Sequence, residues 1–381
     1  MGKIFDVLKE KGITYYQSER YNLDSFYFEN YQDEGELFEK TGIFENENKQ
    51  DRIIKVEPKT NTSLFKYFLD GSRRTYRIAE AEIGDKLVPI IAGQIGCGVC
   101  KRLSNKIKTH QIKRKNVLML YSRVSDDDYK DIKNKIEQTN SAITVDRYEY
   151  SSNMEIRPEN KAIAKIQDIM YDMEIDLLEE MTKQNILRTD EMLAIDGSLQ
   201  FSNIRDERYF YNVVGISKTF NPNLKNMLKS KNKSIGTLLP KLEYGERTPV
   251  FKYNQTGENQ RFRQTIGAWY LRIRPRNQVK NPLDGIVKIE KIAVLDNEKE
   301  DGFETGLIDN ISSSILLERN VTCYGNDSRW ASHIYSIYLT EVMIKNSFLT
   351  QLVFPLQKNT YNSISYRDAS VYSGNTNFLF R

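Results

Sequence analysis

Short apolar runs separated by Gly, Asp or Lys dominate the chain from Leu64 onward. Three of them stand close together, LFKYFLD, TYRIAEAEIG and KLVPIIAGQIG. Runs of this length with such boundaries are typical of strands joined by tight connections, so we predict an antiparallel meander of three short strands. After a basic stretch, the runs NVLMLYS and AITVDRYEY predict two more strands, with a helix between them that begins at Ser125.

A long helical repeat follows these strands. Apolar residues recur at three- and four-residue spacing over residues 158–184, which predicts one amphipathic helix. These residues are Ile163, Ile166, Met170, Met173, Leu177 and Met181. The continuous apolar run EMLAIDGSL then predicts a buried strand. Further strands are expected at FYNVVGISKTF, TPVFKYN, AWYLRIRP and GIVKIEKIAV, and a last helix at residues 328–345.

This succession of elements predicts a mixed α/β fold in which helices flank a mixed central sheet. We expect residues 1–60 to form an N-terminal extension, residues 61–345 to form one domain, and residues 346–381 to form a C-terminal segment. A strand-helix-strand insert is expected at residues 101–155.

Composition narrows the possible chemistry. The chain has 381 residues, with 56 Lys and Arg against 52 Asp and Glu, so a net charge of +4 implies no polycationic tail. Two His and three Cys are too few for the usual zinc sites. The absence of GxxxxGK[ST] and GxGxxG motifs argues against ATP hydrolysis and dinucleotide binding. Without an apolar run near 18 residues or a secretory signal, a cytoplasmic protein without a membrane span is expected.

Carboxylates recur where the predicted sheet could hold them together. The tripeptide Asp-Gly-Ser occurs twice, beginning at Asp70 and at Asp196, each time after an apolar run. Either copy alone can be a simple turn. Between them, Glu174 falls on the apolar side of the long helix, with Glu180 and Glu179 as the next choices. A carboxylate on that side is costly unless it is paired, binds a cation or reaches solvent at the edge of the apolar stripe.

Asp70, Glu174 and Asp196 together would form an all-oxygen cluster of the kind that binds Mg²⁺ or Mn²⁺. Such a cluster supports phosphoryl transfer, because bound cations activate a water molecule and stabilise the leaving oxygen. The order of a strand with Asp, two hairpin strands, a helix with Glu and a strand with Asp resembles the ribonuclease H-like nuclease fold.

Basic residues near these carboxylates are candidates for binding a nucleic-acid backbone. Two Arg follow the first Asp-Gly-Ser, one Lys ends the VVGISK strand, and residues 101–115 contain seven basic residues and no acidic one. The candidates are Arg73, Arg74, Lys218, Lys113 and Arg114. A solvated charged loop is the simpler explanation for residues 101–115.

Several short motifs resemble those of NurA nucleases, the partners of HerA-type hexameric DNA translocases. They are DGSRR, LAIDGSL, VVGISKT, AWYLRI, GIVKIE and YGNDSRWASH. The resemblance implies that Asp70 and Asp196 are metal ligands and that Glu174 is the helix carboxylate. It also implies that Tyr324 and His333 are late active-site groups. A neutral His333 could ligate a metal or position water, although a lone His at the start of an apolar helix is more often a core residue.

Two functions follow from these observations. The first is a Mn²⁺- or Mg²⁺-dependent deoxyribonuclease that works with a HerA-like hexameric ATPase in DNA repair or antiviral defence, with a homodimer implied by the resemblance. The alternative is a catalytically silent adaptor that binds DNA and caps such a translocase. DNA cleavage that depends on Asp70 and Asp196 would distinguish them.

Overall fold

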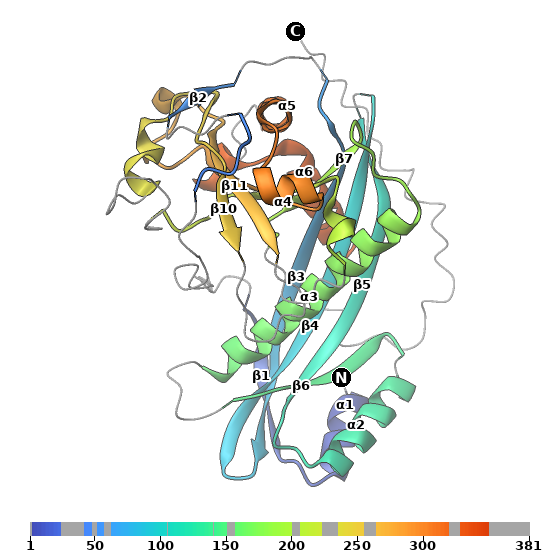
Figure 1. Cartoon of the computed structure of the whole chain (residues 1–381). Helices are drawn as coiled ribbons and strands as arrows, with labels where there is room; N and C mark the ends of the chain where they lie inside the picture. The colour runs from blue at the N-terminus through green and yellow to red at the C-terminus, as the bar shows by residue number, and fades with distance from the viewer. Residues whose placement is uncertain are drawn as a thin grey trace.

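The computed structural model describes residues 2–23, 42–47, 52–56, 62–104, 106–139, 141–150, 157–199, 206–222, 235–254, 264–319 and 328–349. Twelve strands from these residues form one mixed sheet flanked by helices (Figure 1). The strands are β1 (Tyr15–Asn22), β2 (Ile54–Lys55), β3 (Phe65–Ile83), β4 (Lys86–Leu103), β5 (Lys106–Tyr121), β6 (Ile143–Tyr148), β7 (Met192–Asp196), β8 (Val213–Ser217), β9 (Glu246–Arg247), β10 (Phe251–Asn254), β11 (Thr265–Arg272) and β12 (Ile286–Ile292). The helices are α1 (Gly2–Glu10), α2 (Asp126–Thr139), α3 (Pro158–Lys183), α4 (Asp296–Asp301), α5 (Thr305–Glu318) and α6 (Tyr335–Asn346).

The centre of the sheet has the strand order β5-β4-β3-β7-β8. Strands β3, β4 and β5 are antiparallel neighbours, whereas β7 runs parallel to β3 and β8 parallel to β7. Helix α3 comes between the meander and β7 in the chain. This connectivity confirms the mixed α/β fold and the ribonuclease H-like core that were predicted. The sheet continues through β12, β11 and β9 to β2 at one edge.

The meander differs from the prediction, because the first two predicted strands are one. Strand β3 runs unbroken from Phe65 to Ile83 and pairs with β4 through the first Asp-Gly-Ser, where Gly71 lies opposite Cys97. Positive φ angles occur at several described glycines, including Gly197, but not at Gly71. The first Asp-Gly-Ser is therefore extended strand, and only the second is a turn.

The basic stretch at residues 101–115 is also strand. It forms the end of β4 and the first half of β5, whose Lys108 pairs with Lys101 across the hairpin. The remainder of the predicted insert is α2 followed by β6, which pairs in parallel with β5. Lysines alternate with uncharged residues at the start of β5. Such a polar stretch resembles a loop, but the alternation also suits a strand whose lysine side chains point into solvent.

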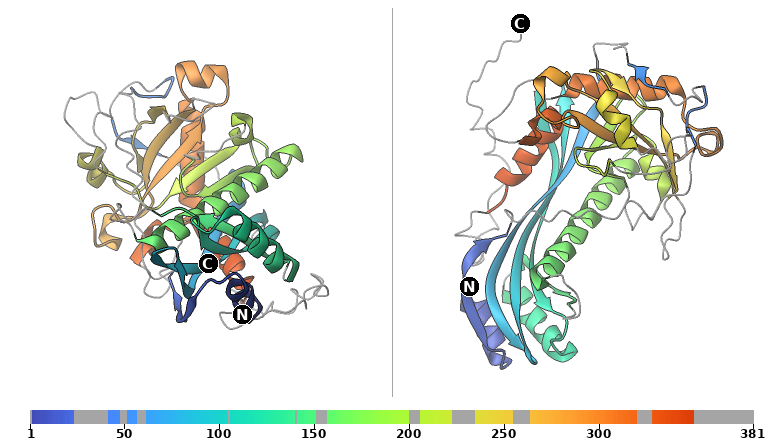
Figure 2. Two further views of the ribbon diagram at one scale, coloured as in Figure 1. Left: turned by 90° about the horizontal axis from the view of Figure 1, so that it is seen from below. Right: turned by 90° about the vertical axis from the view of Figure 1, so that its left-hand side faces the viewer.

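Helices cover both faces of the long meander. Helix α3 lies along one face and α6 against the other, as the right-hand view of Figure 2 shows. Glycines in β4 make this close packing possible: a Cβ at Gly93 would lie 2.9 Å from Ile166 of α3, and one at Gly96 would lie 2.6 Å from Ile344 of α6. The α3 prediction is confirmed to within one residue at its end.

The last predicted helix is interrupted. A short 3₁₀ helix at Ser328–Ser332 precedes α6, and Ile334 pairs with Arg319 as an isolated bridge between them. His333 therefore lies in the connection and not in the helix. None of the helices in the described ranges is long and apolar enough to cross a membrane.

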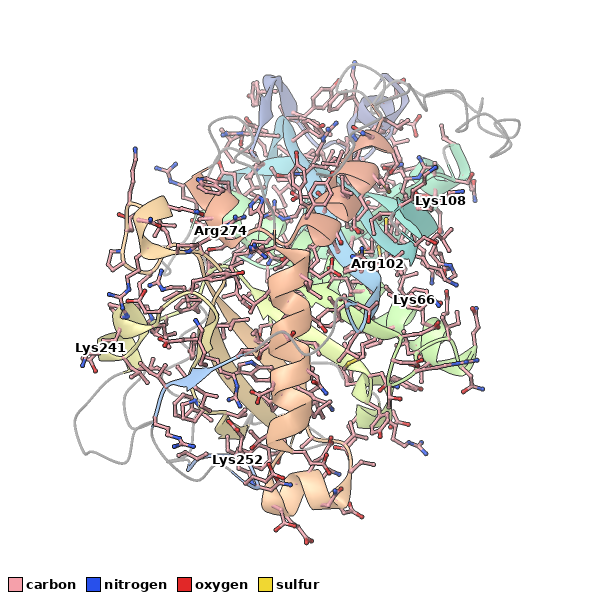
Figure 3. All side chains as sticks on the ribbon, turned by 90° about the horizontal axis from the view of Figure 1, so that it is seen from above. Lys66, Arg102, Lys108, Lys241, Lys252 and Arg274 are labelled. Atoms are coloured by element: carbon pink, nitrogen blue, oxygen red, sulfur yellow. The ribbon has the colours of Figure 1, made fainter. Side chains whose placement is uncertain are left out.

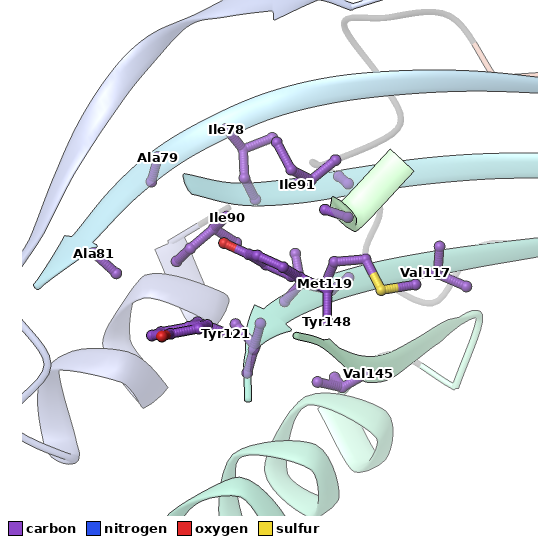
Figure 4. Close-up of a cluster of buried hydrophobic side chains, with 14 of the residues drawn as sticks. Ile78, Ala79, Ala81, Ile90, Ile91, Val117, Met119, Tyr121, Val145 and Tyr148 are labelled. Atoms are coloured by element: carbon purple, nitrogen blue, oxygen red, sulfur yellow. The ribbon is translucent and has the colours of Figure 1, made fainter. Parts of the chain in front are cut away.

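The far end of the meander has its own core. Helices α1 and α2 lie beside the ends of β3 and β4, and β1 pairs with β3 there (Figure 1). Apolar side chains from these elements and from β5 and β6 fill the space between them, among them Ile78, Ile90, Met119, Val145 and Tyr148 (Figure 4). The described N-terminal residues are thus packed against the meander.

Candidate acidic site

The candidate site lies beside β3, in a gap between the two strands that pair with the same edge of it, β7 and β1. Strand β7 pairs with β3 up to Leu69 and ends at Asp196, and β1 joins this edge only from Tyr76. Neither strand runs beside residues 71–74. Side chains from both faces of the sheet can therefore approach each other at this point, which they cannot do through a continuous sheet.

Asp70 and Asp196 stand next to each other at the break. They follow the last paired residues of β3 and β7, Leu69 and Ile195, in matching register. Their side chains share the sheet face of Phe68 and Ala194, which pack against α5 and α6. The two predicted aspartates are thus brought together.

Lys218 lies with these aspartates. It follows β8 directly, and its Nζ donates a hydrogen bond to Asp196 Oδ2 over 2.9 Å. Burial favours the neutral amine, but the nearby charges of Asp196 and Asp70 outweigh it and raise the pKa of Lys218. Lys218 is therefore a cation held inside the acidic site, whereas the sequence predicted a contact with nucleic acid.

Glu174 reaches the break from α3, on the opposite face. Its Oε1 lies 2.1 Å from where a Cβ of residue 71 would be, so only Gly71 leaves room for it against the strand. Burial, and then repulsion by Asp196, raises the pKa of Glu174 to about 8. The other two candidates on this helix point elsewhere: Glu180 pairs with Lys113, and Glu179 pairs with Lys183.

Asp70 is as deeply buried as Glu174. Burial raises its pKa well above the usual range, repulsion by Asp196 adds to this, and Lys218 opposes it. Its Oδ2 is buried and makes no hydrogen bond to any of the described residues. A buried acceptor in this state is stabilised by a proton or by a bound cation.

Glu290 of β12 holds the second Asp-Gly-Ser in place. Its Oε2 accepts hydrogen bonds from Ser198 Oγ and from the backbone N–H of Leu199, both over 2.7 Å. Its other oxygen pairs with the fully buried Lys288 at 2.8 Å. The turn uses a φ of +107° at Gly197, a conformation that favours glycine. Sequence analysis missed Glu290, although two charges at alternate positions of an apolar strand were a usable signal.

A fourth carboxylate comes from α6. Glu341 repels a negative charge on Asp70 and so contributes to its raised pKa, and it also raises the pKa of Lys218. Glu341 pairs with Lys345 one turn later at 2.6 Å. No local pattern in the sequence marked this residue, because only the packing of α6 against β3 brings it near the site.

The late predicted residues have different outcomes. His333 is buried, and its ring lies 5.8 Å from that of Tyr338 on α6. Its role at the site stays a prediction. Tyr324 lies outside the described residues.

The predicted basic residues are spread over three places. Arg73 lines a cavity of about 290 Å³ beside the break, and Arg74 lies over the ring of Phe348 after α6. Lys113 pairs with Glu180, and Arg114 donates to the carbonyl of Ser347. Further up the meander, Lys66, Arg102 and Lys108 lie together on one side of α5 (Figure 3).

The donor set fits a hard divalent cation. Asp70, Glu174 and Asp196 supply only oxygen ligands, and the buried Oδ2 of Asp70 is available to a cation. In the described part of the chain, no three His, Cys, Asp or Glu side chains are already arranged as a metal site. Side-chain movement is therefore needed for binding.

Comparison with known proteins gives a distant likeness among solved structures. No family model and no curated protein matches the chain. Among solved structures, the crystal structure of the NurA nuclease from Sulfolobus solfataricus is similar over 77% of this chain and 81% of that chain, with a TM-score of 0.40 and 10% identity. A likeness this weak carries no argument about activity, so a functional proposal must rest on the site. Fold and site define a mixed α/β protein with a desolvated acidic centre.

The raised pKa of Glu174 predicts how stability depends on pH. Between about pH 4.5 and about pH 8, the folded protein keeps a proton on Glu174 that the unfolded chain has lost. The free energy of unfolding of metal-free protein should therefore fall as pH rises through this window, by about 1.4 kcal/mol per unit of pKa difference at most. Urea unfolding at a series of pH values measures this change in the free energy of unfolding. Glu174→Gln should flatten the curve and Glu179→Gln should not; equal slopes for wild type and Glu174→Gln would contradict the assignment.

A methyl group at residue 71 should disturb the site without disturbing the strand. Gly71 is extended, so Ala fits the backbone, but its Cβ would collide with Glu174 and Met170. We expect Gly71→Ala to keep its circular dichroism spectrum and to bind Mn²⁺ more weakly in calorimetry. The matched control is Gly306→Ala, because nothing lies within 4 Å of where its Cβ would be. Gly84→Ala, at the far hairpin turn, is unsuitable because Gly84 has a positive φ. Unchanged Mn²⁺ affinity in Gly71→Ala would show that Glu174 does not contribute.

Removal of Glu290 should cost more stability than removal of an exposed carboxylate. Glu290→Ala removes the carboxylate that pairs with the buried Lys288, and loss of one partner of a buried ion pair typically costs about 3–5 kcal/mol. Ser198→Ala removes the hydrogen bond from Ser198 Oγ to Glu290, worth about 1.5–3 kcal/mol because its acceptor is charged. Denaturant unfolding of both variants, with the exposed Glu300→Ala as control, measures the difference. A loss no larger in Glu290→Ala than in Glu300→Ala would contradict this role.

Proposed function

We propose that the protein is a divalent-metal-dependent deoxyribonuclease that hydrolyses phosphodiester bonds of DNA. The observation that carries the proposal is the meeting of Asp70, Glu174 and Asp196 at the break beside β3. Two buried carboxylates beside a third that is partly exposed are unfavourable as anions unless positive charge joins them. Their location at the break between two central strands of a ribonuclease H-like sheet, with Arg73 close by, supports a phosphate-bearing substrate.

The residues of the chain would divide the work. Asp70, Glu174 and Asp196 would hold the cation, which when bound neutralises charge on the phosphate and acidifies a water molecule. Lys218 fixes the orientation of Asp196 through their hydrogen bond. Glu290 fixes the turn that follows Asp196. Arg73 is placed to bind a neighbouring phosphate.

One observation favours the adaptor as a second candidate. Lys218 already neutralises Asp196, and the described carboxylates are not preassembled as a metal site. A protein that had lost catalysis could keep this ion pair for stability alone. In that case the chain would bind DNA without cutting it.

The HerA-like hexameric ATPase, the homodimer and the role in repair or defence are further parts of the proposal. They rest on the sequence motifs alone. Co-purification of the chain with an ATPase of that class would test the partnership separately from cleavage.

Cleavage of end-labelled DNA tests the proposed activity. We expect purified protein to degrade single- or double-stranded DNA with Mn²⁺ or Mg²⁺, and not with EDTA. Asp70→Asn, Asp196→Asn and Glu174→Gln should each lower the rate by more than roughly 100-fold, since even residues behind metal ligands cost 10- to 100-fold. Matched controls are Asp190→Asn, in the exposed turn before β7, and Glu180→Gln on α3.

Two results would contradict the nuclease. One is full activity in Asp70→Asn and Asp196→Asn, which would place the chemistry elsewhere. The other is salt-sensitive DNA binding with no cleavage under any divalent cation, which would support the adaptor.

A further inference from the structure

Helix α3 connects the acidic site with the neighbouring cavity. Gln167 and Met170 line the cavity, and Glu174 lies one turn further along the same side of the helix, over Gly71. Gly71 itself lines the cavity. The cavity therefore adjoins Glu174 through Gly71.

An aromatic residue stands on the same side of the helix. Tyr171 is 36% exposed, and its hydroxyl accepts a hydrogen bond from Gln167 Nε2. Its environment includes both Glu174 and Arg73, whose charges act on its hydroxyl in opposite directions. Tyr171 does not itself line the cavity, but its hydrogen bond with the lining residue Gln167 holds its hydroxyl beside it.

The other side of the cavity is basic. Arg73 from β3 and Lys345 from α6 both line it, together with Ser72. Lys345 is held by its ion pair with Glu341. The cavity has a volume of about 290 Å³, just below the usual range of ligand sites, and is open to solvent, so part of a bound nucleotide could extend beyond it.

This combination fits one nucleotide of an unpaired strand. A flat base can stack on Tyr171 and contact the thioether of Met170 and the amide of Gln167, while Arg73 and Lys345 attract its phosphate. In a duplex, both faces of a base are already covered by its neighbours, so stacking on a side chain requires an unstacked base.

We propose that the cavity lined by Arg73 of β3 and Lys345 of α6, together with the neighbouring ring of Tyr171 on α3, is a subsite for an unpaired nucleotide next to the scissile phosphate, which makes the protein selective for single-stranded DNA. The inference deepens the proposed nuclease function and rests on it for the position of the scissile phosphate. The binding subsite itself is testable without cleavage.

The test measures binding in EDTA, where no metal-dependent cleavage occurs. The probes are a fluorescein-labelled single-stranded oligodeoxynucleotide, a duplex of the same length, and a single strand that contains 2-aminopurine. Tyr171→Ala should weaken single-strand binding by roughly 10-fold, the size of effect expected for stacking on one base, and leave duplex binding unchanged. Tyr171→Phe should keep most of the affinity, because it keeps the ring.

Three comparisons complete the design. Tyr16→Ala removes a more exposed Tyr, 53% against 36% for Tyr171, on β1 at the far end of the meander, and should have no effect. Lys345→Gln should weaken single-strand binding and reduce its salt dependence. Quenching of 2-aminopurine fluorescence by wild-type protein, lost in Tyr171→Ala, would report the stacked base directly.

The inference is overturned if Tyr171→Ala binds single strands as wild type does, or if it loses single-strand and duplex binding equally. It is supported if the single-strand preference falls while thermal unfolding stays unchanged. A protein that never cuts DNA but shows this preference would refute the nuclease and retain the subsite. If the protein cuts DNA and Tyr171→Ala does not change single-strand binding, the subsite is refuted and the nuclease is retained.

Discussion

Repulsion between buried carboxylates is the constraint around which the centre of this molecule is built. Asp70 and Glu174 are both held away from water, and each feels the charge of Asp196. Metal-free protein limits the cost in two ways, since Lys218 supplies one positive charge and raised pKa values keep protons on the carboxylates. A site with these properties is costly for folding, and such sites are more often kept for function than for stability.

The surrounding fold serves to bring these groups together from opposite faces of the sheet. Strand β7 stops at Asp196, whereas β3 continues. Glu174 of α3, on one face of the sheet, can therefore approach Asp70 and Asp196, whose side chains lie on the other face. Gly71 leaves room for Glu174 against β3, and Glu290 stabilises the turn after β7 by accepting a hydrogen bond from the backbone N–H of Leu199. Each of these residues acts on the site through position and none of them needs to touch a substrate.

The sequence predicted the three carboxylates because each left a local signal. Asp70 and Asp196 follow apolar runs, and Glu174 interrupts an apolar helix face. Local patterns could not show that β3 passes through the first Asp-Gly-Ser, since a polar stretch in the middle of a strand looks like a turn. Nor could they reveal Glu341, which depends on how α6 packs, or the ion pair of Lys218, which depends on the register of β7 and β8.

Protons and cations compete for the same oxygens at this site. A divalent cation must displace the proton that Glu174 holds up to about pH 8, and it must share Asp196 with Lys218. Metal affinity should therefore rise with pH and be linked to proton release. The same linkage explains why the carboxylates need not be preassembled: without a cation, protonation and the Lys218 ion pair are what allow them to be buried. A bound cation would replace that protonation and draw the carboxylates together.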